Sequence, residues 1–113
     1  MNCPLPAGSA RRQIVGAFRK KLIPAMDVFR PDLVIVSAGF DSRAGDPLGG
    51  FRLRDADFAE LTSIMLEIAD RYAQRRLVSV LEGGYNLEGL GRAAIAHCAA
   101  LCATTGRGRD SHR

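Results

Sequence analysis

The sequence lacks any apolar run long enough to cross a membrane. None of its hydrophobic stretches approaches the ~18 residues that a membrane-spanning helix requires. The first twelve residues, MNCPLPAGSARR, also lack the apolar stretch that follows a basic start in a signal peptide. We therefore expect a cytoplasmic globular protein with no membrane partner.

Cysteine and aromatic residues are both scarce. The three cysteines are irregularly spaced, which argues against a disulfide framework and favours reduced thiols. The net charge is +4, but the basic residues are scattered and are not interleaved with aromatics, which form only 6% of the chain. We therefore expect no direct nucleic-acid binding, because such a surface needs clustered basic residues.

Three widespread motifs are missing as well. The sequence has no G-x-S-x-G serine elbow, no G-x-x-x-x-G-K-[ST] phosphate loop and no G-x-G-x-x-G dinucleotide motif. Their absence argues against the commonest serine hydrolases and nucleotide-binding proteins.

Apolar periodicity predicts three helices. Apolar residues recur at three- and four-residue steps after Ser9 and again after Asp55, and these two residues are the expected N-caps. Pro24 should kink or divide the first helix, since it lacks an N–H for the backbone ladder. A third helix is expected over about 87–103, followed by a mobile basic tail at 104–113.

Two apolar runs, 33–36 and 77–81, predict strands. They lack polar alternation, which is typical of strands buried on both faces of a parallel sheet. The helix between them predicts a parallel pair, so both strands end at the same edge of the sheet. Open α/β sheets bind ligands beyond that edge, and we therefore expect the chemistry in the segments after Val36 and Leu81.

The segment after the first run contains two carboxylates. Asp41 lies just past a buried strand, where its charge needs compensation by a metal, an arginine or backbone N–H groups. The pattern alone favours the alternative that Asp41 caps a turn. Asp46 precedes Pro47 in a glycine-rich stretch and is expected to form a turn.

The segment after the second run places two glycines before a tyrosine. Gly83 and Gly84 permit close backbone approach, and the hydroxyl of Tyr85 can donate a hydrogen bond to an oxyanion. The alternative is a tight strand-to-helix turn with Tyr85 packed on the sheet.

His97, Cys98 and Cys102 form the remaining candidate cluster, on the third helix. The two cysteines share a helix face, but a structural zinc site usually needs four ligands and no fourth is evident. We expect a small apolar core face with reduced thiols.

The segments that end the two strands resemble a known family. In order along the chain, Arg30–Asp41, Gly45–Gly50 and Leu81–Leu87 are similar to the C-terminal third of histone deacetylases, especially the class II and bacterial branch. Asn2–Pro6 is similar to the segment that precedes the first helix in that branch, which includes acetoin-utilisation proteins and acetylpolyamine amidohydrolases. The resemblance covers roughly residues 2–101. It implies a three-layer α/β/α parallel sheet of the arginase/deacetylase type, of which this chain is the C-terminal portion.

The resemblance also implies a reaction and a set of site residues. The reaction is the hydrolysis of an acetylated lysine or a related acetylated amine by zinc-activated water. Asp41 corresponds to a zinc ligand, and Tyr85 to the group that hydrogen-bonds the scissile carbonyl oxygen. The residues that correspond to the substrate channel and its backbone wall are Pro47, Leu48, Gly83 and Gly84.

Other parts of the family's catalytic machinery lie upstream of the matching segments. These are a tandem histidine pair and an Asp-x-His triplet that supplies two further zinc ligands. We expect residues 1–113 to contain no His-His pair and no Asp-x-His triplet, and nothing that replaces them. We therefore expect that the chain alone neither holds zinc tightly nor hydrolyses amides.

Two hypotheses about function follow. In the first, residues 1–103 are a portion of a deacetylase domain completed by a segment outside this sequence or by another polypeptide. In the second, the chain is a truncated, non-catalytic remnant that acts as a folded or oligomeric interaction module. An unrelated α/β binding domain is a more distant alternative. With only three helices to cover two apolar strands, part of the sheet should stay exposed and promote self-association.

Overall fold

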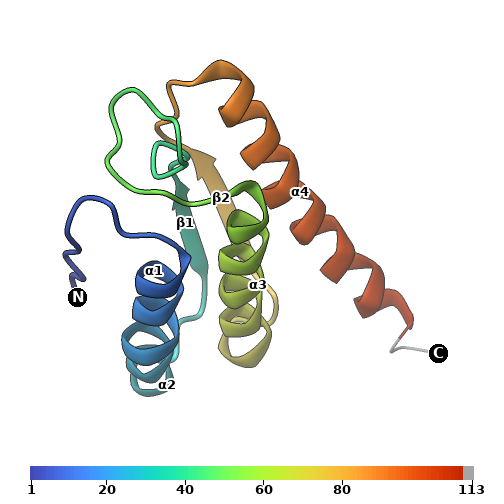
Figure 1. Ribbon diagram of the computed structural model, residues 1–113. Helices are drawn as coiled ribbons and strands as arrows, with labels where there is room; N and C mark the ends of the chain where they lie inside the picture. Colours follow the sequence, from blue (N-terminus) through green and yellow to red (C-terminus); the bar gives the residue numbers. More distant parts are fainter. Residues whose placement is uncertain (111–113) are drawn as a thin grey trace.

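Helices and strands alternate along the chain as the sequence predicts. The computed structural model describes the backbone of residues 1–110 and the side chains of residues 1–103. Its elements, shown in Figure 1, are α1 (Arg11–Ala17), the π-helical segment η1 (Phe18–Leu22), α2 (Ile23–Phe29), β1 (Val34–Ala38), α3 (Asp55–Tyr72), β2 (Leu77–Leu81) and α4 (Leu87–Asp110). The predicted α/β class is confirmed.

The two strands form a parallel pair, as expected from the helix between them. The register runs from Val34 opposite Leu77 to Ala38 opposite Leu81. Both strands therefore end at the same edge, where the loops 39–54 and 82–86 meet (Figure 1). This edge is where the sequence predicts the chemistry.

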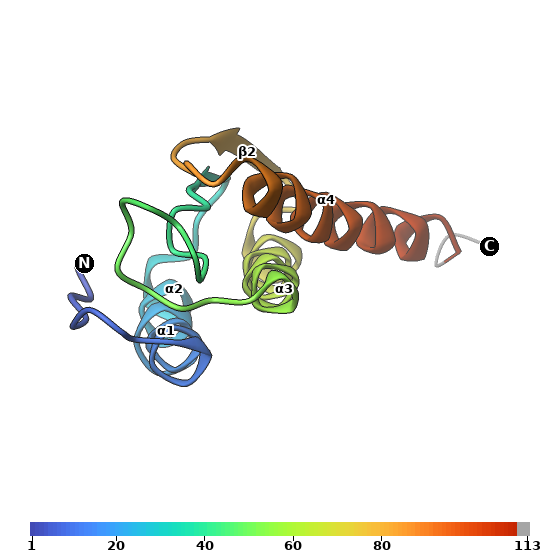
Figure 2. The same ribbon diagram turned by 45° about the horizontal axis from the view of Figure 1, so that its top comes forward.

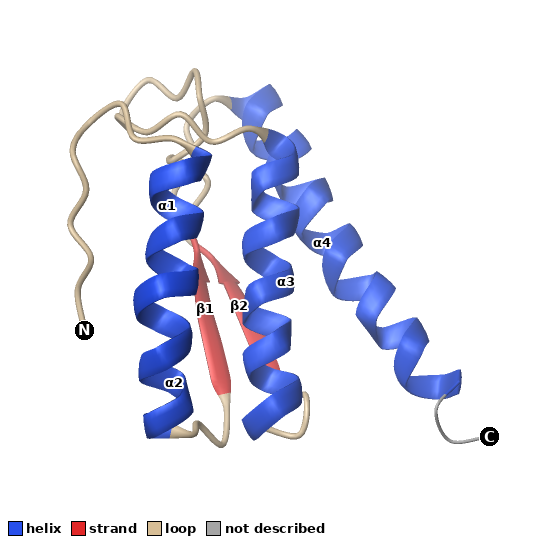
Figure 3. Ribbon diagram, turned by 60° about the horizontal axis from the view of Figure 1, so that its bottom comes forward, coloured by secondary structure: helices blue, strands red, loops and turns tan. Residues whose placement is uncertain are grey.

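The helices cover only one face of the sheet. Figure 3 shows α1, α2 and α3 in front of the strands, and α3 lies between α1 and α4 (Figures 1 and 2). On the other face Ile35, Val78 and Val80 are 65%, 49% and 48% exposed. Strands buried on both faces were expected, but among the described residues nothing covers this second face. The chain thus contributes a sheet and one helical layer.

Two apolar clusters hold the helices to the covered face. One is centred on Phe40, Leu53 and Phe58, and the other on Ile64 and Ile68 of α3. Leu53 and Ile64 are the largest side chains that are fully buried, and burial of an aliphatic side chain of this size stabilises a fold by roughly 1.5–3 kcal/mol. Because Phe40 and Leu53 lie in the loop after β1, the first cluster also anchors that loop.

The first helix is divided where Pro24 requires it. The five π-helical residues of η1 directly precede α2, in which Pro24 occupies the first turn. A widened turn accommodates the proline ring and its missing N–H, so the predicted interruption is confirmed.

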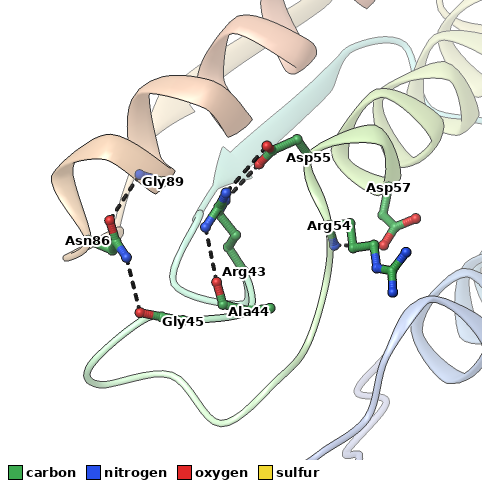
Figure 4. Close-up of polar contacts among 8 residues, drawn as sticks. All are labelled: Arg43, Ala44, Gly45, Arg54, Asp55, Asp57, Asn86 and Gly89. Atoms are coloured by element: carbon green, nitrogen blue, oxygen red, sulfur yellow. Dashed lines mark hydrogen bonds and ion pairs between the residues drawn. The ribbon is translucent and has the colours of Figure 1, made fainter.

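Both predicted N-caps are wrong. The hydroxyl of Ser9 donates to the carbonyl of Pro6, and α1 begins later, with Gln13 accepting from the N–H of Ala10. Asp55 is the first residue of α3 rather than its cap, and the carboxylate of Asp57 accepts from the N–H of Arg54 at 2.7 Å (Figure 4). In both helices the side chain of the third helical residue accepts a hydrogen bond from the N–H of the residue that precedes the helix.

The last helix is longer than predicted. α4 continues to Asp110 rather than ending near residue 103, since Gly106 and Gly108 weaken a helix without stopping it. Residues 111–113 lie outside the described residues, and the mobile tail at 104–113 stays a prediction. No helix in the described part of the chain combines the length and apolarity that crossing a membrane requires.

Candidate functional site at the carboxyl edge of the sheet

Backbone hydrogen bonds join the two loops directly beyond the strands. The N–H of Glu82 donates to the carbonyl of Ala38 at 3.0 Å, and the N–H of Phe40 donates to the carbonyl of Gly83 at 2.8 Å. These bonds extend the parallel pairing by a further step. The loops therefore leave the sheet side by side, which brings residues about forty positions apart into one site.

Asp41 and Tyr85 converge on Gly83. A Cβ at position 83 would lie 2.8 Å from Oδ2 of Asp41 and 3.3 Å from the hydroxyl of Tyr85. The two side-chain oxygens are thus no farther apart than the sum of these distances. Asp41 is partly buried and Tyr85 is 52% exposed, so its phenol is not packed away on the sheet. The predicted meeting of these side chains at one rim is confirmed, while their chemical roles stay predictions.

Glycine makes this close approach possible. A side chain at Gly83 would collide with the carboxylate of Asp41, and a Cβ at Gly49 would lie only 1.7 Å from the backbone carbonyl oxygen of Asp41. Gly84 has a φ of +143°, and a Cβ there would meet Leu90 at 2.7 Å. The positions expected to form a backbone wall therefore leave no room for side chains.

The expected channel residues lie on the outer loop of the site. Pro47 and Leu48 are both exposed, Leu48 by 73%. The N–H of Leu48 is held by Asp46, which fixes the backbone of the loop but not the Leu48 side chain. Their assignment to a substrate channel stays a prediction.

Asp46 does more than form the expected turn. Its Oδ1 accepts from the N–H groups of Leu48 and Gly49, as an Asx turn requires, while its Oδ2 accepts from the N–H of Tyr85 at 2.9 Å. Burial acts to raise the pKa of the Asp46 carboxyl, but these hydrogen bonds from Tyr85, Gly49 and Leu48 hold that pKa below its usual value. The turn signal at Gly45-Asp46-Pro47 indicated the first two bonds, and nothing local indicated the third.

A second group of contacts braces the same loops (Figure 4). Arg43 donates from Nε to Asp55 at 2.6 Å and from Nη1 to the carbonyl of Ala44 at 3.0 Å. The guanidinium of Arg43 also lies against Gly89, since a Cβ on Gly89 would be only 2.7 Å from Nη1 of Arg43. The hydrogen bond from Arg43 holds the pKa of Asp55 below its usual value, against the effect of burial. The loop after β1 is therefore tied to the starts of both α3 and α4.

Asn86 provides another such tie. Its side-chain oxygen accepts from the N–H of Gly89 and caps α4, while its Nδ2 donates to the carbonyl of Gly45 at 3.2 Å (Figure 4). Sequence reasoning overlooked Arg43 and Asn86 and expected Asp55 only as an N-cap, although an asparagine just before a helix is a recognisable capping signal.

The cluster on α4 differs from its prediction. His97 is buried, and its two ring nitrogens contact the hydroxyls of Thr62 at 2.6 Å and Ser79 at 2.8 Å. Cys98 and Cys102 are free and exposed, so the expected core face containing both thiols is wrong. At helical spacing the buried face passes through His97 and leaves its neighbours on the outer side.

The described residues include no group of three histidines, cysteines or carboxylates placed to hold a metal ion. Asp41 therefore stands as a single candidate ligand among them. The expectation that the chain lacks an Asp-x-His triplet is wrong, because Asp110-Ser111-His112 has this form. That triplet follows the Tyr85 segment instead of preceding the Asp41 segment, and Ser111 and His112 lie outside the described residues.

The chain is similar to histone deacetylases over almost its whole length. A model of the histone deacetylase domain matches residues 1–101. The type-2 histone deacetylase 1 of Dictyostelium discoideum is 37% identical over 101 residues, which are 89% of this chain and 7% of that protein. The chloroplastic histone deacetylase 10 of Oryza sativa is 42% identical over 90 residues, which are 80% of this chain and 20% of that protein.

A solved structure gives the same result. The histone deacetylase Clr3 superposes with a TM-score of 0.76 at 38% sequence identity, over 85% of this chain and 16% of the Clr3 chain. The arginase/deacetylase type of fold is therefore confirmed for this unit. The chain spans no more than a fifth of the length of these relatives.

Proposed function

This chain belongs to the histone deacetylase family, and from that premise we propose that its two loops supply part of the active site of a zinc-dependent deacetylase. The single observation that supports this proposal most strongly is the convergence of Asp41 and Tyr85 on Gly83. A carboxylate and a phenol beyond adjacent strand ends provide one metal ligand and one neutral hydrogen-bond donor.

Each residue has a distinct proposed role. The carboxylate of Asp41 is one ligand of the zinc ion, which when bound polarises the amide carbonyl and activates water. The hydroxyl of Tyr85 donates a hydrogen bond to the oxygen that gains negative charge as the amide is attacked. Its half-exposed position leaves the hydroxyl accessible to a substrate.

The proposed substrate is an acetylated lysine or a related acetylated amine. Pro47 and Leu48 line its approach in this proposal, which is supported by their exposure on the loop that Asp46 ties to Tyr85. The backbone at Gly83 and Gly84 forms the opposite wall, where a side chain would collide with Asp41 or Leu90.

Zinc binding in this proposal needs ligands beyond the described residues. A catalytic zinc ion normally has three protein ligands, and Asp41 is one. Because the chain spans a small share of its relatives, we propose that the remaining ligands and the histidine pair come from the rest of a deacetylase domain, in the same or another polypeptide.

Complementation tests this proposal. Zinc content and hydrolysis of an acetyl-lysine peptide are measured for the purified chain, and then for the chain mixed with the remaining part of a deacetylase domain as a separate polypeptide. We expect stoichiometric zinc and turnover only in the mixture.

Two variants assign the roles within the mixture. Asp41→Asn should lose zinc, whereas Tyr85→Phe should keep zinc and lose turnover by about 100-fold or more, as removal of an oxyanion donor does elsewhere. Tyr72→Phe, a tyrosine at the end of α3, is the matched control and should retain activity. Full zinc content in Asp41→Asn would contradict the assignment of this ligand.

The uncovered sheet face favours one alternative function. Ile35, Val78 and Val80 form an exposed apolar surface that suits a non-catalytic interaction module. Absence of zinc and turnover both in the chain and in the mixture would support this alternative.

A further inference from the structure

Asp46 is the only described side chain whose carboxylate oxygens are shared between the β1 loop and the backbone of Tyr85. Oδ1 accepts from Leu48 at 2.8 Å and from Gly49 at 2.9 Å, which completes the local turn. Oδ2 is not needed for that turn and accepts from the N–H of Tyr85, 39 positions away in the chain. The carboxylate is therefore divided between a local and a long-range role.

The turn that Asp46 closes is pressed against Asp41. Gly49, whose N–H donates to Asp46, lies so close to the backbone of Asp41 that a Cβ would come within 1.7 Å of its carbonyl oxygen. A shift of this turn would therefore displace Asp41. One carboxylate thus connects the backbone positions of Asp41 and Tyr85.

We propose that Asp46 is a positioning residue, which fixes the phenol of Tyr85 relative to the carboxylate of Asp41. This inference rests on the proposed function of those two residues. Among the described residues, the other side-chain link between these two loops is the bond from Asn86 to the Gly45 carbonyl, which joins two neutral groups at a longer 3.2 Å. A hydrogen bond to an ionised carboxylate is about twice as strong as a bond between neutral groups, so Asp46 provides the stronger of these two side-chain restraints.

Replacement of Asp46 by asparagine separates the two roles. The single carbonyl oxygen of an asparagine suits the two N–H donors of the turn, which leaves its amide NH₂ facing the N–H of Tyr85. Asp46→Asn should therefore break the long-range bond and keep the turn. Asp32→Asn, at the opposite end of β1, makes the same chemical change away from the site and is the matched control.

Amide hydrogen exchange of the chain provides the first test. In the native sequence the N–H of Tyr85 should exchange slowly although it lies outside helices and strands. Asp46→Asn should raise its exchange rate about tenfold or more and leave that of Gly49 within about twofold, while Asp32→Asn changes neither. An unprotected Tyr85 amide in the native sequence, or equal acceleration at Tyr85 and Gly49, would overturn the proposal.

Kinetics of the complemented enzyme provides the second test. Asp46→Asn should lower kcat about tenfold with KM and zinc content unchanged, and should have no further effect in a Tyr85→Phe background. An unchanged kcat in Asp46→Asn would refute the positioning role even if exchange at Tyr85 accelerates. Absence of activity in every arrangement, with the exchange result as expected, would instead refute the proposed function.

Discussion

Close backbone packing at single glycines shapes the site at the residue scale. Gly49 lies against the backbone of Asp41, and Gly83 lies against both its carboxylate and the hydroxyl of Tyr85. The space in which these groups meet exists because neither position carries a side chain. Substitutions at these two positions should therefore displace Asp41 directly.

Gly49→Ala should destabilise the chain by about 1–3 kcal/mol, the usual cost of forcing extra atoms into a packed region. Its Cβ would fall 1.7 Å from a backbone oxygen that cannot rotate away. Gly50→Ala is the matched control, since its Cβ would make an ordinary contact with Ala7 at 3.4 Å. Urea unfolding of the two variants measures the difference, and equal midpoints would show that the loop relaxes freely around position 49.

The positions of Asp41 and Tyr85 at one edge could be predicted from the sequence, and so could the turn at Asp46, but the bond from Tyr85 to Asp46 could not. Asp41 and Tyr85 lie in the short segments that follow the two apolar runs, and parallel strands bring such segments to one edge. The long-range hydrogen bond of Asp46 is accepted from a backbone N–H in another loop. Nearly every residue type carries a backbone N–H, so the sequence does not show which residue is the donor. The tertiary partner, not the local turn signal, determines what this aspartate does.

At the element scale, His97 joins three elements that the sequence treats separately. It lies on α4 and contacts Thr62 of α3 and Ser79 of β2. The hydroxyl of Thr62 also donates to the carbonyl of Phe58, which places a polar chain within an apolar layer. Burial holds the pKa of His97 below its ordinary value of 6.5, so the folded chain favours the neutral ring.

The free energy of unfolding should therefore decrease as the pH falls below about 6.5. Above that value His97 is neutral in both the folded and unfolded states; below it the unfolded state binds the proton more readily. In His97→Gln this contribution to the pH dependence should disappear. Urea unfolding at several pH values between 5 and 8 measures it (roughly the span over which a histidine titrates), and identical slopes in the two proteins would exclude His97 as the cause.

Element positions followed from periodicity better than their caps did. β2 occupies the predicted range of 77–81, because a short apolar run bounded by polar residues is a local signal. Aspartate is a common N-cap residue, but the carboxylate of Asp55 accepts from Arg43. The carboxylate of Asp57 instead accepts from the N–H at the start of the helix. Whether a carboxylate caps a helix depends on its other hydrogen-bond partners. The partner of Asp55 is Arg43, which lies twelve residues earlier in the chain.

At the scale of the whole molecule, helices cover one face of the sheet and leave the other face exposed. Ile35, Val78 and Val80 are about half exposed or more, with no charged residue between them on the strands. Isolated chains should therefore associate through this face.

Sedimentation velocity should show concentration-dependent association of the native chain, which Ile35→Lys with Val80→Lys should abolish. Val28→Lys is the control, because Val28 is 86% exposed on α2, away from the sheet, and should leave association unchanged. A native chain that stays monomeric at every concentration would contradict this use of the open face.

The pairing of β1 with the very next strand, across a single helix, has a consequence for how the chain acquires its shape. Val34 pairs with Leu77 and Ala38 with Leu81, so each strand partner lies 43 positions away in the chain and a long segment must close before the strands can pair. The backbone that presents Asp41 and Tyr85 should therefore take shape only after α3 has folded back and brought the two strands together. In the proposed function, this backbone becomes catalytic only when the rest of a deacetylase domain supplies the other zinc ligands.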